Sequence, residues 1–241
     1  MIQLKASPKP TRRESHAFLS TLVAIALIAL CLWASNWQYQ RGVARHHRNT
    51  LIASQSVLAP TTLAIIEKNV PAAEWRKVEV EGNFDPAHQI LLRNRYFDGK
   101  YGFDLLTLFT DSANNSFWVD RGWIAPGKTA KVTPSLPPTS TSLISITGRI
   151  RLDQSLPQGS FFAIAPGSRN LIEKWNAQSG SRIQTEKFYL DLLSTSDSTM
   201  TPAVPVELPE LSDGPHMAYA LQWLFFAGLV VYGRLLLRRA R

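Results

Sequence analysis

Two long apolar runs, one near each end of the chain, constrain the fold more than any other feature. Residues 18–34, FLSTLVAIALIALCLWA, carry no charge, and residues 217–237, MAYALQWLFFAGLVVYGRLLL, carry only Arg234, close to one end. A helix over the first run is roughly 26 Å long, close to the bilayer core of about 30 Å. The long stem of Arg234 can reach the headgroups. The sequence predicts transmembrane helices over 18–34 and 216–237, with membrane lipid as a partner.

The formal net charge of +8 is concentrated beside these runs. Between the runs, basic and acidic side chains nearly balance. The high basicity therefore does not describe a nucleic-acid-binding surface, and no DNA or RNA partner is expected. Glu14 is the only acidic residue in either tail, and the basic residues there are Lys5, Lys9, Arg12, Arg13, Arg234, Arg238, Arg239 and Arg241.

Basic residues also predict the orientation, because Lys and Arg are retained on the cytoplasmic side of a membrane. The tails, residues 1–17 and 238–241, are expected in the cytoplasm and residues 35–215 on the other side, the periplasm of a bacterium. The absence of Lys and Arg from Phe188 to Tyr232 supports this orientation. Three basic residues just after the first run oppose it: Arg41, Arg45 and Arg48.

Other interpretations of the first run fit less well. A cleavable signal peptide needs small residues at its cleavage site, and LCLWAS offers no clear one. A bacterial lipoprotein signal has a small residue immediately before its cysteine, whereas Leu30 precedes Cys31 in this chain. About 16 residues precede the run and make a poor transit peptide, which favours a bacterial over a mitochondrial membrane. An uncleaved anchor is expected, in which the single cysteine only packs.

The region between the anchors changes at Glu74 to short β-rich segments separated by turn residues. VEVEG and ISITGRIR alternate apolar and polar residues, as strands with one buried face do. FDGKYG reads as a hairpin connection, and Ser168 and Gly180 bracket one predicted helix. The predicted fold is an α+β membrane protein whose two terminal helices flank a β-rich, mostly antiparallel extracytoplasmic domain. Strands are predicted over 75–82, 89–95, 103–109, 116–124, 143–151, 161–165 and 187–193.

One stretch, GWIAPGKT at residues 122–129, matches the phosphate-loop pattern G-x-x-x-x-G-K-[ST]. That loop needs a helix directly after it, and the prolines in AKVTPSLPP disfavour one, so nucleotide binding is not expected. The chain has no G-x-S-x-G elbow, no H-E-x-x-H and no cysteine pair. Asp104, Asp120 and Asp153 are expected to be salt-bridged or solvated. No enzyme is predicted.

Aromatic and basic residues gather beside the first run. The segment after Trp33 favours a helix, so this helix is expected to continue past the membrane with Trp33, Trp37 and Arg41 on one face. An aromatic belt at the membrane interface explains that face. His46 and His47 point about 100° apart on a helix and cannot hold one metal together.

His216 begins the second predicted helix and shares a face with Tyr219, Ala220 and Trp223. Ala220 leaves a gap between large neighbours in which a flat macrocycle could lie, with His216 as axial ligand to its iron. The other interpretation is an interfacial aromatic belt in which the imidazole is incidental. Residue chemistry alone favours the belt.

Six segments carry a resemblance to a known family: NWQYQR, VEVEGNF, ILLRNRYFDGKYGFDLLTLF, FWVDRGWIAPG, ITGRIR and HMAYALQWLFFA. In this order, from Trp37 to the C-terminus, they resemble the signature segments of the surfeit-locus family of cytochrome c oxidase assembly proteins. The resemblance implies an integral membrane factor, not an enzyme, that assists maturation of a haem-copper oxidase. Its implied partners are the catalytic subunit of the oxidase and haem a synthase.

The resemblance also implies a cofactor, haem a, bound at the external end of the membrane segments. His216 matches the family histidine, with Tyr219 and Trp223 following it, and Arg41 could pair with a haem propionate if it faces His216. Arg121 and Trp123 fall in the family's RGW-x-P motif, where Arg121 could equally brace the β-domain. The chain departs from the family at LLTLF, where many members have a proline, and at Pro215, where many have Asn. The alternative is a membrane-tethered scaffold for oxidase subunits without a cofactor.

Overall fold

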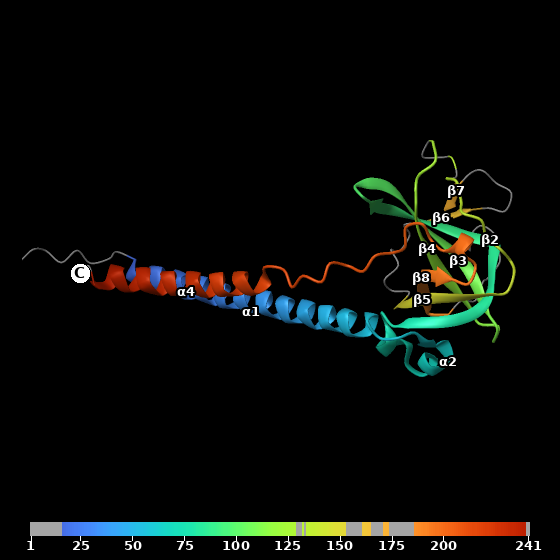
Figure 1. Cartoon of the computed structure of the whole chain (residues 1–241). Helices are drawn as coiled ribbons and strands as arrows, with labels where there is room; N and C mark the ends of the chain where they lie inside the picture. The colour runs from blue at the N-terminus through green and yellow to red at the C-terminus, as the bar shows by residue number, and fades with distance from the viewer. Residues whose placement is uncertain are drawn as a thin grey trace, which may run out of the picture. The chain divides into compact units, whose positions relative to one another are not determined.

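The computed structural model describes residues 16–128, 132, 134–152, 161–164, 171–173 and 186–239. The chain divides into two compact units (Figure 1). The first, called the helical unit below, comprises Met1–Thr50 and Leu211–Arg241. The second, the β unit, comprises Leu51–Glu210.

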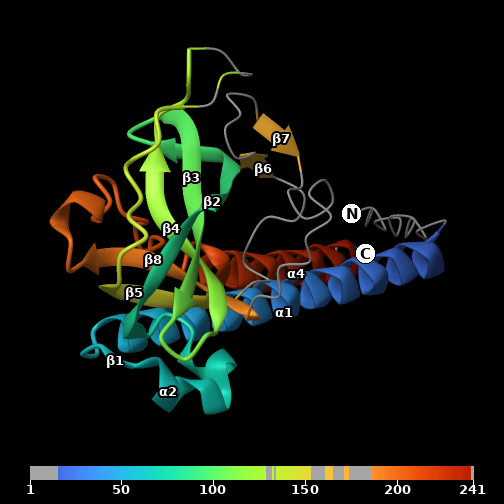
Figure 2. The same cartoon turned by 90° about the vertical axis from the view of Figure 1, so that its right-hand side faces the viewer.

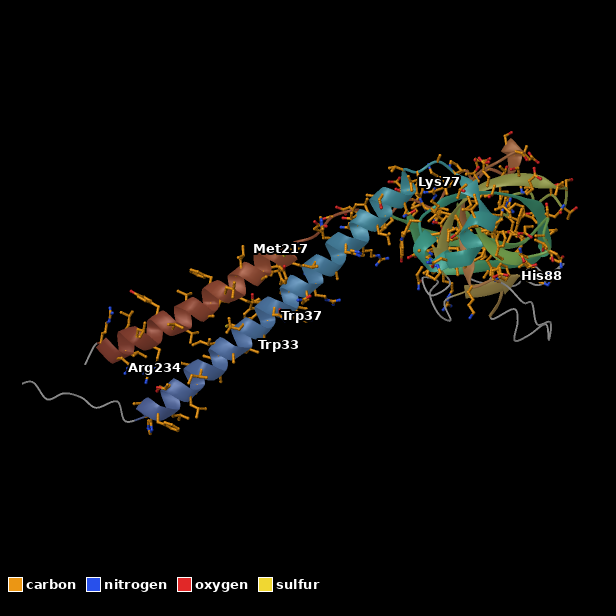
Figure 3. All side chains as sticks on the ribbon, turned by 90° about the horizontal axis from the view of Figure 1, so that it is seen from below. Trp33, Trp37, Lys77, His88, Met217 and Arg234 are labelled. Atoms are coloured by element: carbon orange, nitrogen blue, oxygen red, sulfur yellow. The ribbon has the colours of Figure 1, made fainter. Side chains whose placement is uncertain are left out.

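Two long apolar helices form the helical unit. Helix α1 extends from Ala17 to Ser56 and α4 from His216 to Arg239, and within the helical unit they lie side by side (Figure 3). Both are long and apolar enough to cross a membrane. Of the 18-residue stretch that makes each helix a candidate membrane span, only 17% is buried in α1 and 11% in α4. The predicted helices are confirmed, including the continuation of the first one past residue 34.

The two helices are antiparallel, and polar contacts join them near both ends of α4. Near the start of α1, the Arg234 guanidinium donates to the Thr21 hydroxyl at 2.6 Å and to the Ala17 carbonyl at 2.9 Å. In the middle of α1, the Ser35 hydroxyl donates to the Ala220 carbonyl at 2.9 Å. In a bilayer, these contacts would keep the Arg234 guanidinium and the Ser35 hydroxyl from facing hydrocarbon without a partner.

The β unit is built around a ring of five strands. Strand β2 pairs with β3 and with β5, and the order β3-β4-β8-β5-β2 closes on itself (Figure 2). The β4–β8 pair is parallel and the other four pairs of the ring are antiparallel, so the sheet is mixed. This connectivity is that of a Greek-key barrel of the OB type. The strands are β1 (Thr61–Thr62), β2 (Lys77–Phe97), β3 (Lys100–Asp111), β4 (Ser116–Ile124), β5 (Ile144–Leu152), β6 (Phe161–Ile164), β7 (Leu171–Glu173) and β8 (Phe188–Thr195).

Short helices flank the strands of the β unit: α2 (Leu63–Ile66), η1 (Glu67–Ala73) and η3 (Ser198–Met200). Leu63 and Ile66 of α2 belong to the same buried cluster as the barrel interior. Aliphatic side chains make up most of this cluster, and four phenylalanine rings pack against one another within it. Phe84 and Phe109 lie 4.9 Å apart, Phe109 and Phe117 5.6 Å, and Phe117 and Phe188 5.2 Å.

Two sequence expectations are corrected in the β unit. The strands predicted over 75–82 and 89–95 are one strand, β2, because its pairing with β3 only shifts register between Asp85 and Gln89. A helix was predicted from residue 168 to 180, but residues 171–173 form β7, which pairs with β6. Backbone pairing with the preceding strand outweighs the local capping signals there. The remainder of that prediction lies outside the described residues.

Candidate functional site

The sequence-predicted ligand His216 is held by a residue that the sequence did not single out. Its Nδ1 lies 2.9 Å from Oε1 of Gln38 on α1. An amide oxygen can only accept, so Nδ1 carries a proton in this arrangement, and in the neutral imidazole Nε2 then keeps its lone pair. Both side chains are half-buried. The arrangement leaves one imidazole nitrogen able to bind a metal.

Close packing between α1 and α4 brings these two residues together. A Cβ on Gly42 would lie 3.1 Å from Sδ of Met217 and 3.4 Å from Cβ of His216, so a larger residue here would push the helices apart. Ser35, Gln38 and Gly42 follow one another at spacings of three and four, which places them on one face of α1. This face fixes the position at which His216 meets α1.

The segment that enters α4 is also tied to α1. Asp213 accepts hydrogen bonds from His46 Nδ1 at 2.8 Å and from Asn49 Nδ2 at 2.9 Å, while Arg45 Nε donates to the Ser212 carbonyl at 2.5 Å. The hydrogen bond with His46, followed by that from Asn49, lowers the pKa of Asp213. Sequence reasoning found no acid for His46, because 167 residues separate it from Asp213.

The other predicted site residues lie either in the contact between α1 and α4, called the seam below, or on the surface. Ala220 is buried in the seam, whereas Tyr219 is 47% exposed. Trp223 is half-buried, and its ring stands perpendicular to that of Phe226 at 5.7 Å. The guanidinium of Arg41 lies over the Trp37 ring, 5.4 Å from its centroid. The structure thus places Gln38, not Arg41, opposite His216.

An apolar groove of about 480 Å³ lies between the two helices. Small and aliphatic residues line most of it, and Asn36 and Tyr39 supply polar atoms. Its described lining does not include His216, Tyr219 or Trp223. The lining residues are Leu32, Ser35, Asn36 and Tyr39 of α1 and Met217, Ala220, Leu221 and Leu224 of α4.

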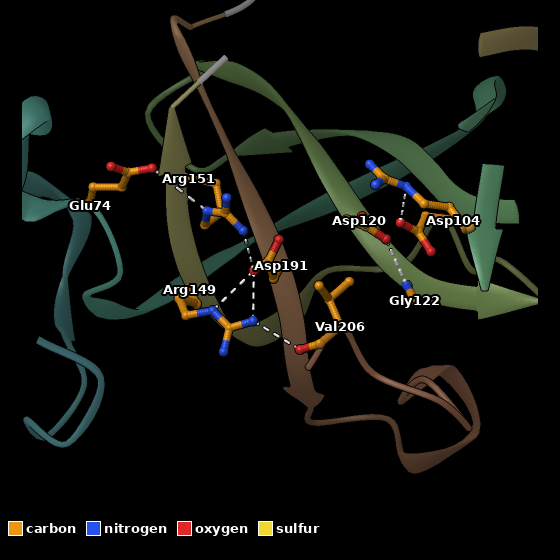
Figure 4. Close-up of polar contacts among 9 residues, drawn as sticks. Glu74, Asp104, Asp120, Gly122, Arg149, Arg151, Asp191 and Val206 are labelled. Carbon is orange, nitrogen blue, oxygen red and sulfur yellow. Dashed lines mark hydrogen bonds and ion pairs between the residues drawn. The ribbon is translucent and has the colours of Figure 1, made fainter. Parts of the chain in front are cut away.

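The β unit contains a buried ion-pair network, drawn in Figure 4. Oδ2 of Asp191 accepts from Nε and Nη2 of Arg149 at 3.0 and 2.7 Å and lies 3.5 Å from Nη1 of Arg151. The Arg149 guanidinium also donates to the Val206 carbonyl at 2.8 Å, and Arg151 lies over the Trp75 ring. Burial raises the pKa of Asp191, and the two guanidinium groups oppose that rise.

Two further acids lie beside this network. Asp120 is fully buried, and Oδ1 accepts the Gly122 amide at 2.9 Å. Burial, and then the charges of Asp104 and Asp191, raise its pKa well above the ordinary value. Burial also raises the pKa of Asp104 to about 6, although Arg95, 2.6 Å away, lowers it. The expectation of a salt-bridged or solvated acid is confirmed for Asp104. It is wrong for Asp120, which is buried and accepts a hydrogen bond from a backbone amide, and Asp153 lies outside the described residues.

The RGW segment at the end of β4 has a structural role. Gly122 has φ +88°, and a Cβ there would lie 2.1 Å from the Val204 carbonyl oxygen, which accepts the Trp123 amide at 3.0 Å. Buried Arg121 donates to the Thr139 hydroxyl and the Pro138 carbonyl at 2.5 and 2.6 Å. Burial lowers the pKa of Arg121 to about 10. These contacts tie two loops to the barrel.

The described residues that follow β4, 125–128, 132 and 134–143, form no helix. The segment GWIAPGKT therefore lacks the helix N-terminus that a phosphate loop needs. Among the residues that the structure describes, no group of three or more His, Cys, Asp or Glu side chains could hold a metal ion. A lone imidazole such as that of His216 could bind only a metal whose other ligands come from elsewhere, as the macrocycle supplies them to a haem iron.

Comparison with known proteins identifies the family. The model of the SURF1 family matches residues 25–228, which include most of both helices and the whole β unit. The chain belongs to the SURF1 family. SURF1 proteins are linked to the assembly of cytochrome oxidase. They are assembly factors and are not known as enzymes. The resemblance drawn from the sequence is confirmed.

Individual SURF1 relatives are similar over most of the chain. Uncharacterized SURF1-like proteins of Mycobacterium bovis (strain ATCC BAA-935 / AF2122/97) and Mycobacterium tuberculosis (strain ATCC 25618 / H37Rv) are each 25% identical to it. Each alignment covers 219 residues, 88% of this chain and 79% of the relative. The likeness to individual relatives therefore covers most of the chain.

Proposed function

We propose that this SURF1 protein binds haem a through His216 and aids its insertion into the catalytic subunit of a haem-copper cytochrome oxidase. The observation that carries the proposal is the hydrogen bond between His216 Nδ1 and Gln38, which leaves Nε2 free to bind iron. Neutral imidazole is a common axial ligand of haem. The iron would supply the bond to Nε2, and the chain would supply position and surroundings.

The surroundings of His216 fit a haem at the edge of a membrane. Tyr219 and Trp223 lie one and two turns further along α4 and can contact a flat apolar ring. Arg41 is exposed one turn from Gln38 on α1 and lies over Trp37 rather than opposite His216, so its guanidinium would have to turn to bind a propionate by charge-assisted hydrogen bonds. Haem a synthase is the proposed source of the haem, and the catalytic subunit its acceptor.

We propose further that the protein lies in a bacterial inner membrane with both tails in the cytoplasm. The basic tails and the two apolar helices support this orientation. It would place residues 35–215 in the periplasm, with His216 at the external end of α4.

The second candidate function is a scaffold that holds oxidase subunits without a cofactor. Exposed aromatic rings at the tip of the β2–β3 hairpin favour it: Tyr96 is 66%, Phe97 37% and Tyr101 38% exposed. Aromatic residues are enriched in protein–protein contacts. Such a scaffold would need the hairpin and not His216.

Genetic complementation separates the two functions. A strain without the gene should lose haem a-dependent oxidase activity and keep other respiration. If the haem function holds, His216→Ala expressed at wild-type level does not restore the haem a content of the oxidase, whereas His47→Ala, an exposed histidine on α1, does. If His216→Ala restores it fully, the scaffold is the better account. Normal oxidase in the deletion strain contradicts both.

A further inference from the structure

We infer that Gln38 is a positioning residue for His216, which fixes the imidazole as its Nδ1–H tautomer and presents Nε2 as the ligand atom. The inference rests on the proposed haem function for its biological meaning, but its structural content concerns only these two side chains. They are 178 residues apart in sequence and 2.9 Å apart in the structure.

Packing on both sides restrains the pair. One turn before Gln38, Ser35 donates to the Ala220 carbonyl at 2.9 Å, and one turn after it, Gly42 packs against Met217 and His216. Neither helix can slide along the other without breaking one of these contacts, so the backbone of Gln38 is held beside that of His216. Gln38 therefore reaches His216 from a fixed position.

The acceptor is an amide, and this choice has a chemical consequence. Metal-bound histidines commonly donate their second N–H to a carboxylate or a carbonyl, which raises the basicity of the ligand. A carboxylate draws the Nδ1 proton more strongly than a neutral amide oxygen does. Gln38 thus orients His216 while keeping it a weaker donor to iron, as suits a carrier that must release its haem.

The first test needs no haem. The full-length protein, ¹⁵N-labelled at histidine and reconstituted in lipid nanodiscs, is studied by NMR of the imidazole nitrogens, with His216 assigned by comparison with His216→Ala. The wild type should show His216 as the Nδ1–H tautomer, and Gln38→Leu should lose this preference. Gln40→Leu, the same change at an exposed position of α1, should retain it. An Nε2–H tautomer in the wild type, or no change in Gln38→Leu, overturns the inference.

The second test uses protein loaded with haem a. Loss of an outer-shell partner typically weakens metal affinity 10- to 100-fold, so Gln38→Leu should bind haem a more weakly by about this factor. Gln38→Glu should recover tight binding and lower the reduction potential of the iron, since its carboxylate makes the imidazole a stronger donor. Wild-type affinity in Gln38→Leu, or an unchanged potential in Gln38→Glu, contradicts the positioning role.

The two tests also separate this inference from the function on which it rests. If the tautomer is as expected and the wild type binds no haem, the proposed function fails and the positioning of His216 stands. If the wild type binds haem through His216 and Gln38→Leu is indistinguishable from it in tautomer and affinity, the function stands and the role of Gln38 fails.

Discussion

Gly122→Ala should destabilise the β unit far more than Gly99→Ala, although both glycines have positive φ. Gly99 has φ +70° with nothing within 4 Å of the position of a Cβ, whereas at Gly122, with φ +88°, the Val204 carbonyl oxygen is 2.1 Å away. An alanine at either position is forced into the left-handed region. Only at residue 122 must a neighbouring backbone segment also move.

The expected magnitudes follow from these two terms. The left-handed conformation costs a non-glycine residue about 1–2 kcal/mol, so Gly99→Ala should lower the free energy of unfolding by about that amount. At Gly122 the displaced Val204 carbonyl also loses the Trp123 amide, about 1 kcal/mol, and repacking adds at least about 1 kcal/mol more. The difference between the variants is about 2 kcal/mol, roughly 30-fold in the folded-to-unfolded ratio.

Urea titration with pulse proteolysis of the full-length protein in nanodiscs measures this difference, if cleavage is followed by fragments of the β unit. The two variants should have different urea midpoints, with the lower midpoint for Gly122→Ala. Equal midpoints would refute the argument that the close approach of residue 204, rather than φ alone, requires glycine in the RGW segment.

Three further predictions concern charge and helix packing. Asp191→Asn should lower the free energy of unfolding by about 3–5 kcal/mol at pH 7, because it leaves buried guanidinium groups unpaired. Asp120→Asn replaces a carboxyl whose pKa is raised, and it should lower the free energy of unfolding by less than about 1 kcal/mol. Equal losses in urea titrations would contradict this. The pKa of Asp104 is about 6 in the folded protein and near 3.8 in the unfolded chain, so its contribution to stability is present below about pH 4 and is lost, by up to about 3 kcal/mol, as pH rises to about 6. Asp104→Asn should therefore flatten the pH dependence of the urea midpoint over that window. An unchanged slope would count against this prediction. Gly42→Leu should separate α1 from α4, which lowers the yield of a disulfide between Ser35→Cys and Ala220→Cys in a Cys31→Ser background. Gly228→Leu is the control, because a Cβ at residue 228 meets nothing within 4 Å, and it should leave the yield unchanged. Equal yields in the two variants would argue against close packing at Gly42.

Local patterns were sufficient for the elements whose neighbours are close in sequence. The prediction for 116–124 matches the bounds of β4, and both apolar runs form helices. The FDGKYG hairpin also follows from local turn chemistry, and β2 pairs with β3 across it. Strand β2 was predicted as two strands, because the residues at a register shift are similar in type to the residues at a turn.

The contacts that define the candidate site could not be predicted in this way. Gln38 and Asp213 act on His216 and His46 across more than 160 residues, and neither has an unusual local pattern. The sequence left open whether Arg41 faces His216, because it fixes which residues share a face of α1 but not which face meets α4. That choice depends on small residues such as Gly42, which let the helices approach closely.

The visible spectrum of the purified protein tests the central claim most directly. The wild type, His216→Ala and His47→Ala are each expressed together with the enzymes of haem a synthesis and purified from the membrane. The account predicts one spectrum of bound haem a for the wild type and His47→Ala, and its loss or displacement in His216→Ala. A colourless wild-type protein, or a spectrum and haem content unchanged by His216→Ala, would contradict it.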